Sequence, residues 1–273
     1  MKIALMDSGI GLLAAAAALR RLRPDAELVL SSDPDSMPWG PRTPADVTRL
    51  ALGCARAAAA HRPDALIVAC NTASVHALEA LRAELEPGLP VIGTVPAIKP
   101  AAATGGPVAI WATPATTGSP YQRALIRDFA DGAQVTEVAC HGLADAVQRA
   151  DEPAVAAAVA DAAARTPAGV RALVLGCTHY ELVAAAIRAA VADTAHPDLA
   201  LFGSADAVAA QALRRVGAAG SAPGADGGGA LRVLLGGRDS ALPAAALRFA
   251  EGRSLAGAAA PLTAERRVLD GSL

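Results

Sequence analysis

Short runs of consecutive apolar residues recur along the chain, separated by longer stretches whose apolar positions repeat with a helical period. Such runs, bounded by turn residues, are typical of strands buried on both faces of a parallel sheet. They predict strands at residues 2–6, 27–31, 65–69, 90–94, 108–113, 134–139, 171–175 and 231–235. The intervening stretches predict helices at residues 12–23, 45–60, 73–86, 120–130, 153–165 and 241–250. Strands alternating with helices indicate an α/β fold.

Two strand patterns in the first part of the chain recur in the second. Residues 65–72 read Ala-Leu-Ile-Val-Ala-Cys-Asn-Thr, and residues 172–179 read Ala-Leu-Val-Leu-Gly-Cys-Thr-His, 107 positions later. The units at 3–8 and 108–113 are separated by about 105 residues. A repeated pattern at a nearly fixed offset indicates structurally similar units. We therefore predict two similar α/β halves, joined near residues 96–106.

Cysteines and small polar residues gather where the predicted strands end. Asp7 and Ser8 follow the first strand, residues 70–72 the third, 113–116 the fifth and 177–179 the seventh. Open parallel sheets bind ligands outside the carboxyl ends of their strands. If the two halves face each other, we expect these residues to line one cleft.

Cys70 and Cys177 differ in position from the other two cysteines. A free cysteine is usually a small buried hydrophobe, and this is our interpretation of Cys54 and Cys140. Cys70 and Cys177 each open a turn into a predicted helix, whose N-terminal amides favour the thiolate. Two thiols presented alike by two halves suit a reaction that removes a proton from one face of a carbon and returns one to the other.

Neighbouring polar groups fit such a reaction. His179 is a plausible hydrogen-bonding partner for Cys177, and Asp7 is a candidate acceptor for the Cys70 thiol or a substrate ammonium. Neutral donors that could bind carboxylates without arginine are Ser8, Asn71, Thr72, Thr113, Thr116 and Thr178. Each alone could instead cap a helix, but six at one sheet edge favour a binding role.

Composition narrows the possible partners. The 273 residues are 53% hydrophobic and carry a net charge of −2, so a large core is possible and no basic surface is expected. Aromatic residues are only 3%, which leaves few platforms for stacking bases. No apolar run predicts a membrane span or a signal peptide. Four widely spaced cysteines suit reduced thiols in a cytoplasm better than a disulfide framework.

The motifs for common cofactors are weak. Residues 9–14 match the dinucleotide pattern G-x-G-x-x-A, but Asp7 lies two residues before it and would repel a pyrophosphate. Pyridoxal phosphate needs a lysine, and the chain contains only Lys2 and Lys99, neither at a convincing position. No Cys/His pairs have the spacing of zinc ligands. We therefore expect neither a cofactor nor a metal.

These motifs resemble the cofactor-independent aspartate/glutamate racemase superfamily, and within it the glutamate racemase family. The resemblance runs from residue 2 to about 250, and its most specific part is the pair of motifs at 69–72 and 176–179. Further matches, in the family's order, are residues 7–11, 38–40, 90–93, 96–99 and 112–116. The resemblance implies two α/β domains with parallel sheets, pseudo-twofold related, and an active site in the interdomain cleft. The implied first domain comprises 1–97 and 207–255, and the second 98–206. The weak pattern of residues 256–273 predicts a mobile tail.

The same resemblance implies two-base racemisation of a free amino acid, glutamate above all. Cys70 and Cys177 would flank Cα as thiolate and thiol, with Asp7 assisting Cys70 and His179 assisting Cys177. The residues implied to hold the substrate are Asp7, Ser8, Trp39, Gly40, Asn71, Thr72, Thr113, Thr116, Thr178 and His179. The family also implies a homodimer whose D-glutamate supplies peptidoglycan synthesis.

Several positions depart from the family pattern. Trp39 replaces a tyrosine, Leu12 a glycine, His141 and Glu181 prolines, and Gln148 a glutamate. Gln148 can form hydrogen bonds but cannot carry charge on the histidine side of the site. These changes leave open a divergent paralogue acting on aspartate or another amino acid, and a non-catalytic binding protein. A related lyase, which would often keep one cysteine, and a nucleotide-binding protein are less favoured.

Overall fold

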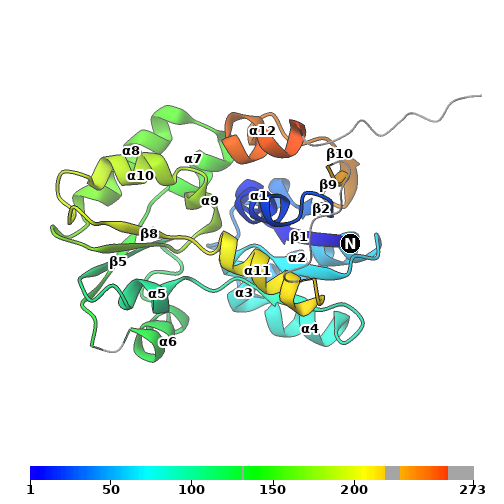
Figure 1. Cartoon of the computed structure of the whole chain (residues 1–273), viewed down its shortest axis with the longest axis horizontal. Helices are drawn as coiled ribbons and strands as arrows, with labels where there is room; N and C mark the ends of the chain where they lie inside the picture. Colours follow the sequence, from blue (N-terminus) through cyan, green and yellow to red (C-terminus); the bar gives the residue numbers. More distant parts are fainter. Residues whose placement is uncertain (131, 219–227, 258–273) are drawn as a thin grey trace, which may run out of the picture.

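Two sheets, one in each half of the molecule, form its frame (Figure 1). Their strands pair in parallel, except that β10 at the edge of the first sheet is antiparallel to β9. The computed structural model describes residues 1–130, 132–218 and 228–257. The first sheet has the order β10-β9-β2-β1-β3-β4 and the second the order β6-β5-β7-β8. The first contains β1 (Lys2–Asp7), β2 (Glu27–Ser32), β3 (Ala65–Val68), β4 (Val91–Gly93), β9 (Leu231–Leu235) and β10 (Arg238–Ser240). The second contains β5 (Val108–Ala112), β6 (Val135–Ala139), β7 (Ala172–Leu175) and β8 (Ala200–Phe202).

The repeat predicted from the sequence is present in the strand order. Strands β2-β1-β3-β4 of the first sheet correspond in order to β6-β5-β7-β8 of the second. Ile3 pairs with Ala65 in one sheet, and Val108 pairs with Ala172 in the other. Ile3 corresponds to Val108, and Ala65 to Ala172, at the spacing of the sequence repeat. The prediction of two similar α/β halves with parallel sheets is therefore confirmed.

Helices cover both faces of the first sheet. Ile3 and Leu5 of β1 face a core shared with α1 (Leu13–Leu22) and α11 (Ala205–Arg215). Ala4 and Met6 point the other way, toward α2 (Pro44–Ala59) and α4 (Leu78–Leu85). This alternation follows from the two-residue period of a strand. A short α12 (Ala250–Gly257) packs on α1.

The second sheet is built in the same way. Trp111 and Leu173 face one core, shared with α7 (Leu143–Arg149), α8 (Glu152–Ala164) and α10 (Ala184–Val191). Ile110 and Val174 face the other, shared with α5 (Ile98–Ala102) and α6 (Pro120–Phe129). Two short helices, α3 (Asn71–His76) and α9 (Thr178–Glu181), follow the equivalent strands β3 and β7. Both sheets therefore direct strand ends and helix starts toward the same region.

Two helix predictions were wrong in detail. The helix predicted at 73–86 is divided into α3 and α4 at Ala77, where the His76 carbonyl accepts a hydrogen bond from Thr48 Oγ1 (3.0 Å). The helix predicted at 241–250 is replaced by a 3₁₀ turn, Ala246–Arg248, before α12. Phe249 is extended between them (φ −96°, ψ 150°), which breaks the helical path.

The structure describes only part of the chain after residue 218. The glycine- and alanine-rich sequence at 218–230 is typical of a flexible loop. Its residues 219–227, and residues 258–273 of the predicted tail at 256–273, lie outside the described residues. Residues 256 and 257 belong to α12. None of the helices in the described part of the chain is long and apolar enough to cross a membrane.

Candidate functional site

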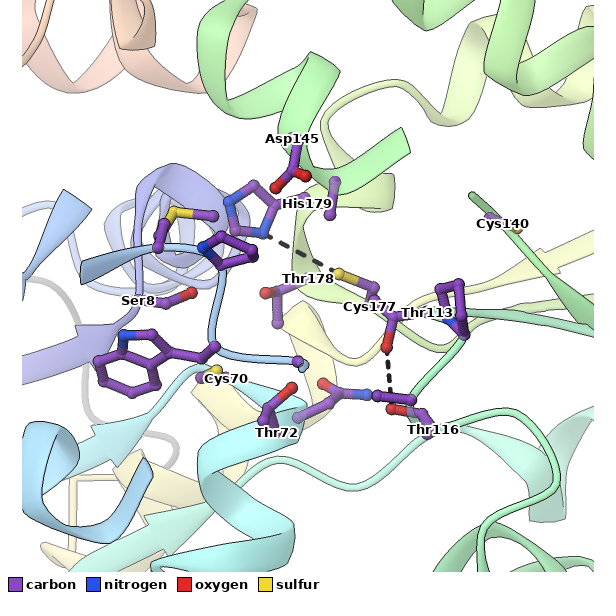
Figure 2. Close-up of a pocket in the computed structure, with 18 of the residues that line it drawn as sticks. Ser8, Cys70, Thr72, Thr113, Thr116, Cys140, Asp145, Cys177, Thr178 and His179 are labelled. Carbon is purple, nitrogen blue, oxygen red and sulfur yellow. Dashed lines mark hydrogen bonds between the residues drawn. The ribbon is translucent and has the colours of Figure 1, made fainter. Parts of the chain in front are cut away.

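All twelve residues expected at the site line one cavity of about 250 Å³. It lies at the carboxyl ends of β1, β3, β5 and β7, and both halves of the chain contribute to its wall. The expected residues that line it are Asp7, Ser8, Trp39, Gly40, Cys70, Asn71, Thr72, Thr113, Thr116, Cys177, Thr178 and His179. Figure 2 shows Cys70 and Cys177 entering this cavity from the two different sheets.

The two thiols occupy equivalent backbone positions. Cys70 is the N-cap of α3 (φ −146°, ψ 118°), and Cys177 is the N-cap of α9 (φ −141°, ψ 135°). The residues before them make equivalent hydrogen bonds, from Ala69 N to Met6 O and from Gly176 N to Trp111 O, both 2.8 Å. The sequence repeat therefore translates into a repeated presentation of a thiol at the end of a strand.

Residues that follow the cysteines connect the two halves of the site. Asn71 Nδ2 donates to Gly176 O (2.8 Å), and Thr178 Oγ1 donates to Asp7 Oδ2 (3.1 Å). A Cβ on Gly9 would overlap Gln148, and one on Gly11 would overlap Thr178. Gly9 and Gly11, the glycines of the dinucleotide-like motif, thus allow residues of the second half to approach the backbone of the first. Side chains of the second half fill the space that a pyrophosphate would need.

Asp7 is a buried carboxyl group beside Cys70. It accepts hydrogen bonds from Ser8 N (2.6 Å), Ser8 Oγ (3.1 Å) and Thr178 Oγ1, and it also interacts with the Cys70 thiol. Burial raises the pKa of Asp7 from 3.8 to about 7, although these hydrogen bonds oppose the shift. Asp7 can therefore take up or release a proton near neutral pH, in contact with the thiol.

His179 holds the corresponding place beside Cys177. Its Nδ1 lies 3.9 Å from Cys177 Sγ, and its Nε2 lies 3.1 Å from Gln148 Oε1. Ile10 N also donates to Gln148 Oε1 (2.9 Å), and because a backbone N–H can only donate, this atom of Gln148 must be the oxygen. His179 Nε2 then carries the hydrogen, so Nδ1 offers a free lone pair to the thiol.

Burial also keeps this imidazole neutral. It lowers the pKa of His179 from 6.5 to about 4. A neutral ring with hydrogen on Nε2 can accept a proton at Nδ1, which is the atom nearest Cys177 Sγ. The two thiols are therefore paired with two chemically different bases, a carboxyl group and an imidazole.

The expected shift of both thiols toward the thiolate was wrong. Burial raises the pKa of Cys177 to about 12 and that of Cys70 well above its ordinary value, where the charge of Asp7 adds to the shift. Backbone N–H groups at the starts of α3 and α9 act in the favourable direction, but burial outweighs them. Neither thiol is therefore ionised at neutral pH by itself, and each must pass its proton to the neighbouring base to become a thiolate.

Trp39 contributes shape to the wall. Its indole Nε1 donates to Ser36 Oγ (2.7 Å) and the side chain is only 2% exposed, so its polar atom is used inside the protein. In the second half of the chain, Thr113 Oγ1 and Thr116 Oγ1 are hydrogen-bonded at 3.1 Å (Figure 2). These two hydroxyls present polar atoms at the cavity.

Several lining residues were not predicted. Apolar contributions come from Met37, Pro38, Pro41 and Ala144, and polar ones from Cys140 and Asp145. Cys140 is buried, as expected, and directly follows β6, so its position after a strand was an available signal. Asp145 lies on α7, a helix that the apolar pattern did not predict. The described residues that line the cavity include no lysine or arginine.

Comparison with known proteins places this geometry in a family. A family model described as Asp/Glu/Hydantoin racemase matches residues 11–212. The chain is 37% identical over 214 residues to the glutamate racemase of Roseiflexus sp. (strain RS-1), covering 76% of each chain. It is 36% identical over 201 residues to the glutamate racemase of Deinococcus radiodurans, covering 71% of this chain and 69% of that protein.

Solved structures agree with the sequence relatives. Escherichia coli glutamate racemase, in complex with L-glutamate and an activator, matches with a TM-score of 0.73 and 26% identity, covering 85% of this chain and 88% of that one. Thermus thermophilus glutamate racemase, in complex with β-chloro-D-alanine, matches with a TM-score of 0.62 and 30% identity, covering 86% and 87%.

Proposed function

Because this chain belongs to the Asp/Glu/hydantoin racemase family and is an amino-acid racemase, we propose that it interconverts L- and D-glutamate by means of Cys70 and Cys177. The observation that carries this proposal is the equivalent placement of two thiols at the ends of β3 and β7, in one cavity. Two like groups in two similar halves suit a reaction whose two directions are mirror images.

On the Cys177 side, the proton path starts at the imidazole. The Cys177 thiol passes its proton to His179 Nδ1, and the resulting thiolate removes the α-proton of the amino acid. Gln148 keeps the proton of His179 on Nε2, so that Nδ1 is free to act. The electron pair of the broken C–H bond remains on the substrate as a carbanion.

On the Cys70 side, the thiol protonates the carbanion from the opposite face. Its proton moves to Cα, which inverts the configuration, and Asp7 stabilises or reprotonates the Cys70 thiolate. In the reverse direction Asp7 accepts the Cys70 proton, for which its pKa of about 7 is well matched. Each residue thus acts as acid in one direction and as base in the other.

Neutral polar groups would hold the substrate. Hydroxyls of Thr72, Thr113 and Thr116, with the helix-start amides, suit the two carboxylates. Asn71 Oδ1 is buried and has no hydrogen-bond partner among the described residues, so it can accept from the substrate ammonium. The apolar wall between these groups suits the methylene carbons of the side chain.

The direct test of substrate is chiral chromatography of free amino acids after incubation with the protein under reducing conditions. We expect L- and D-glutamate each to approach a racemic mixture, while other amino acids change much more slowly. Cys70→Ser and Cys177→Ser should each abolish racemisation, with Cys54→Ser as the matched control because Cys54 is buried in α2, outside the cavity wall. Racemisation of another amino acid in preference to glutamate would contradict the assignment.

Cellular role follows from this activity. We propose that the enzyme works without a cofactor in the cytoplasm, as a homodimer, and that its D-glutamate enters peptidoglycan. Light scattering of the purified protein tests the dimer, and rescue of a D-glutamate auxotroph tests the role. Growth that still requires added D-glutamate would exclude that role.

A further inference from the structure

Glu181 makes a connection that the reaction described above does not use. It is the last residue of α9, two positions after His179, and its carboxylate points away from the cavity wall toward the start of α11. Its Oε1 accepts from Ser204 N and Ser204 Oγ, both at 2.8 Å, and its Oε2 accepts from Ala205 N at 3.3 Å. Ser204, the N-cap of α11, does not cap its own helix with its side chain. Glu181 supplies the missing acceptor from a distant part of the chain.

The surrounding backbone is shaped to admit this carboxylate. A Cβ on Gly203 would overlap the carboxylate of Glu181. Gly203 has no positive φ, so its backbone conformation alone does not require glycine. The contact therefore explains the absence of a side chain at position 203.

The two helices joined by this contact belong to different halves. The helix α9 follows β7 of the second sheet, with Cys177 as its N-cap and His179 within it. The helix α11 packs on α1, β3 and β4 of the first half (Figure 1). The chain thus returns from the second half to the first at residues 203–205. Glu181 binds this segment through hydrogen bonds and lies two residues after His179.

Burying the Glu181 carboxylate costs hydration free energy, and its hydrogen-bond donors offset this loss. Burial raises the pKa of Glu181, which shows that the charged form loses hydration. Three donors and the positive end of the 11-residue α11 compensate for this loss. The arrangement is therefore a specific one, made by a charged acceptor and a matching set of donors.

We propose that Glu181 is a positioning residue for the Cys177–His179 half of the site, fixing α9 against the first half of the chain through the start of α11. The inference rests on the proposed racemase function. In front of α9, Thr178 contacts Asp7; behind it, Glu181 contacts Ser204 and Ala205. Loss of the rear contact should displace Cys177 and His179 while leaving Cys70 and Asp7 in place.

The test uses Glu181→Gln, Gly203→Ala and a matched control, Asp206→Asn. Glu181→Gln places an amide N–H₂ against backbone donors, and Gly203→Ala displaces the carboxylate without altering it. Asp206 is an acid in the first turn of the same helix, but it is exposed and pairs with Arg21 at the surface. Its charge raises the pKa of Glu181, so removing that charge should leave the Glu181 carboxylate and its contacts in place. We expect kcat for glutamate racemisation to fall about tenfold in the first two variants and to change by less than about twofold in Asp206→Asn.

Isotope effects distinguish positioning from general loss of structure. The substrate isotope effect on kcat/KM is the ratio of the values for protiated and α-deuterated glutamate, measured separately from the L- and the D-enantiomer. A displaced Cys177 makes proton transfer to Cys177 slower and therefore more rate-limiting. The isotope effect should then rise in the direction in which Cys177 removes the proton and fall in the other direction. Lower activity with both isotope effects unchanged, or unchanged activity, would overturn the proposal.

A second measurement is independent of turnover. Alkylation by iodoacetamide, followed by mass spectrometry of the Cys70 and Cys177 peptides, compares the two thiols within each variant. The Cys177-to-Cys70 rate ratio should shift at least about threefold in Glu181→Gln and Gly203→Ala but not in Asp206→Asn. An unshifted ratio overturns the proposal even if the wild-type protein fails to racemise glutamate, a result that would by itself refute only the proposed function.

Discussion

At the scale of single residues, the two halves of the site present the same nucleophile with different partners. Cys70 is served by a carboxyl group whose pKa is raised to about 7, and Cys177 by an imidazole whose pKa is lowered to about 4. Both shifts have one cause, burial, which disfavours the charged form of each group. Burial therefore leaves His179 neutral and places the pKa of Asp7 near neutral pH, so that the imidazole of His179 and the carboxylate form of Asp7 can each accept a proton from a thiol.

Asp7 should set the acid limb of the pH profile. Its carboxylate is lost as the pH falls below about 7, whereas His179 remains neutral down to about 4. We expect kcat/KM for glutamate to fall about tenfold per pH unit below 7. Initial rates between pH 5 and 9 measure this, and a limb centred near pH 4 would show that Asp7 is not the controlling group.

Replacing Asp7 should lower activity and raise stability. Its pKa is higher in the folded protein than the unfolded value near 3.8, so it lowers stability progressively as the pH rises from about 4 to about 7. Asp7→Asn should reduce kcat at least about 100-fold and raise the free energy of unfolding at pH 8 by at most about 4 kcal/mol. Urea denaturation at pH 8 and below pH 4 checks the sign: a gain of equal size at both pH values would contradict the account.

Gln148 should control the protonation of His179. A carboxylate at this position would stabilise the imidazolium, so Gln148→Glu should raise the pKa of His179 above its value of about 4. Gln148→Ala should lower kcat about tenfold, because the Nε2–H form is no longer held. NMR titration of the His179 ring measures the pKa, and an unchanged value in Gln148→Glu would exclude the hydrogen bond described here.

At the scale of elements, the buried strands could be predicted and several helices could not. Continuous apolar runs such as 65–69 are distinctive because both faces of a parallel strand are covered. The alanine-rich helices α10 and α11 were missed, although the buried residues of α11 (Val208, Ala209, Ala212 and Leu213) repeat at a helical spacing. The break at Ala77 coincides with a hydrogen bond to His76 O from Thr48, which lies 28 residues away in sequence.

Helix capping gives a prediction at this scale that is separate from catalysis. Thr43 caps α2 by accepting from Asp46 N (3.2 Å), and α2 covers one face of the first sheet. Thr43→Ala should reduce the free energy of unfolding by about 1 kcal/mol, whereas Thr43→Ser should retain most of it. Urea denaturation measures both, and kcat should be unchanged because Thr43 does not line the cavity. Equal destabilisation by both variants would show that the cap is unimportant.

At the scale of the whole molecule, the site exists only where the two halves meet. The repeat in the sequence predicted equivalent strand ends and hence a shared cleft, and all the expected residues line one cavity. What it could not predict are the contacts between halves, such as Asn71 with Gly176 and Gln148 with Ile10, because they depend on how closely the halves approach. We propose that the domain boundaries lie at 97/98, as expected, and at the start of α11, two residues before the expected 206/207.

The central claim is that two thiols act on opposite faces of one carbon. Its most direct test is to start from all-protium L- or D-glutamate in deuterated water and to follow Cα deuterium in substrate and product separately by mass spectrometry after chiral separation. The account predicts that, at low conversion, nearly every product molecule carries one solvent deuterium while the remaining substrate carries almost none. Deuterium appearing in the substrate as fast as in the product, from either enantiomer, would indicate a single base and would contradict the two-thiol mechanism.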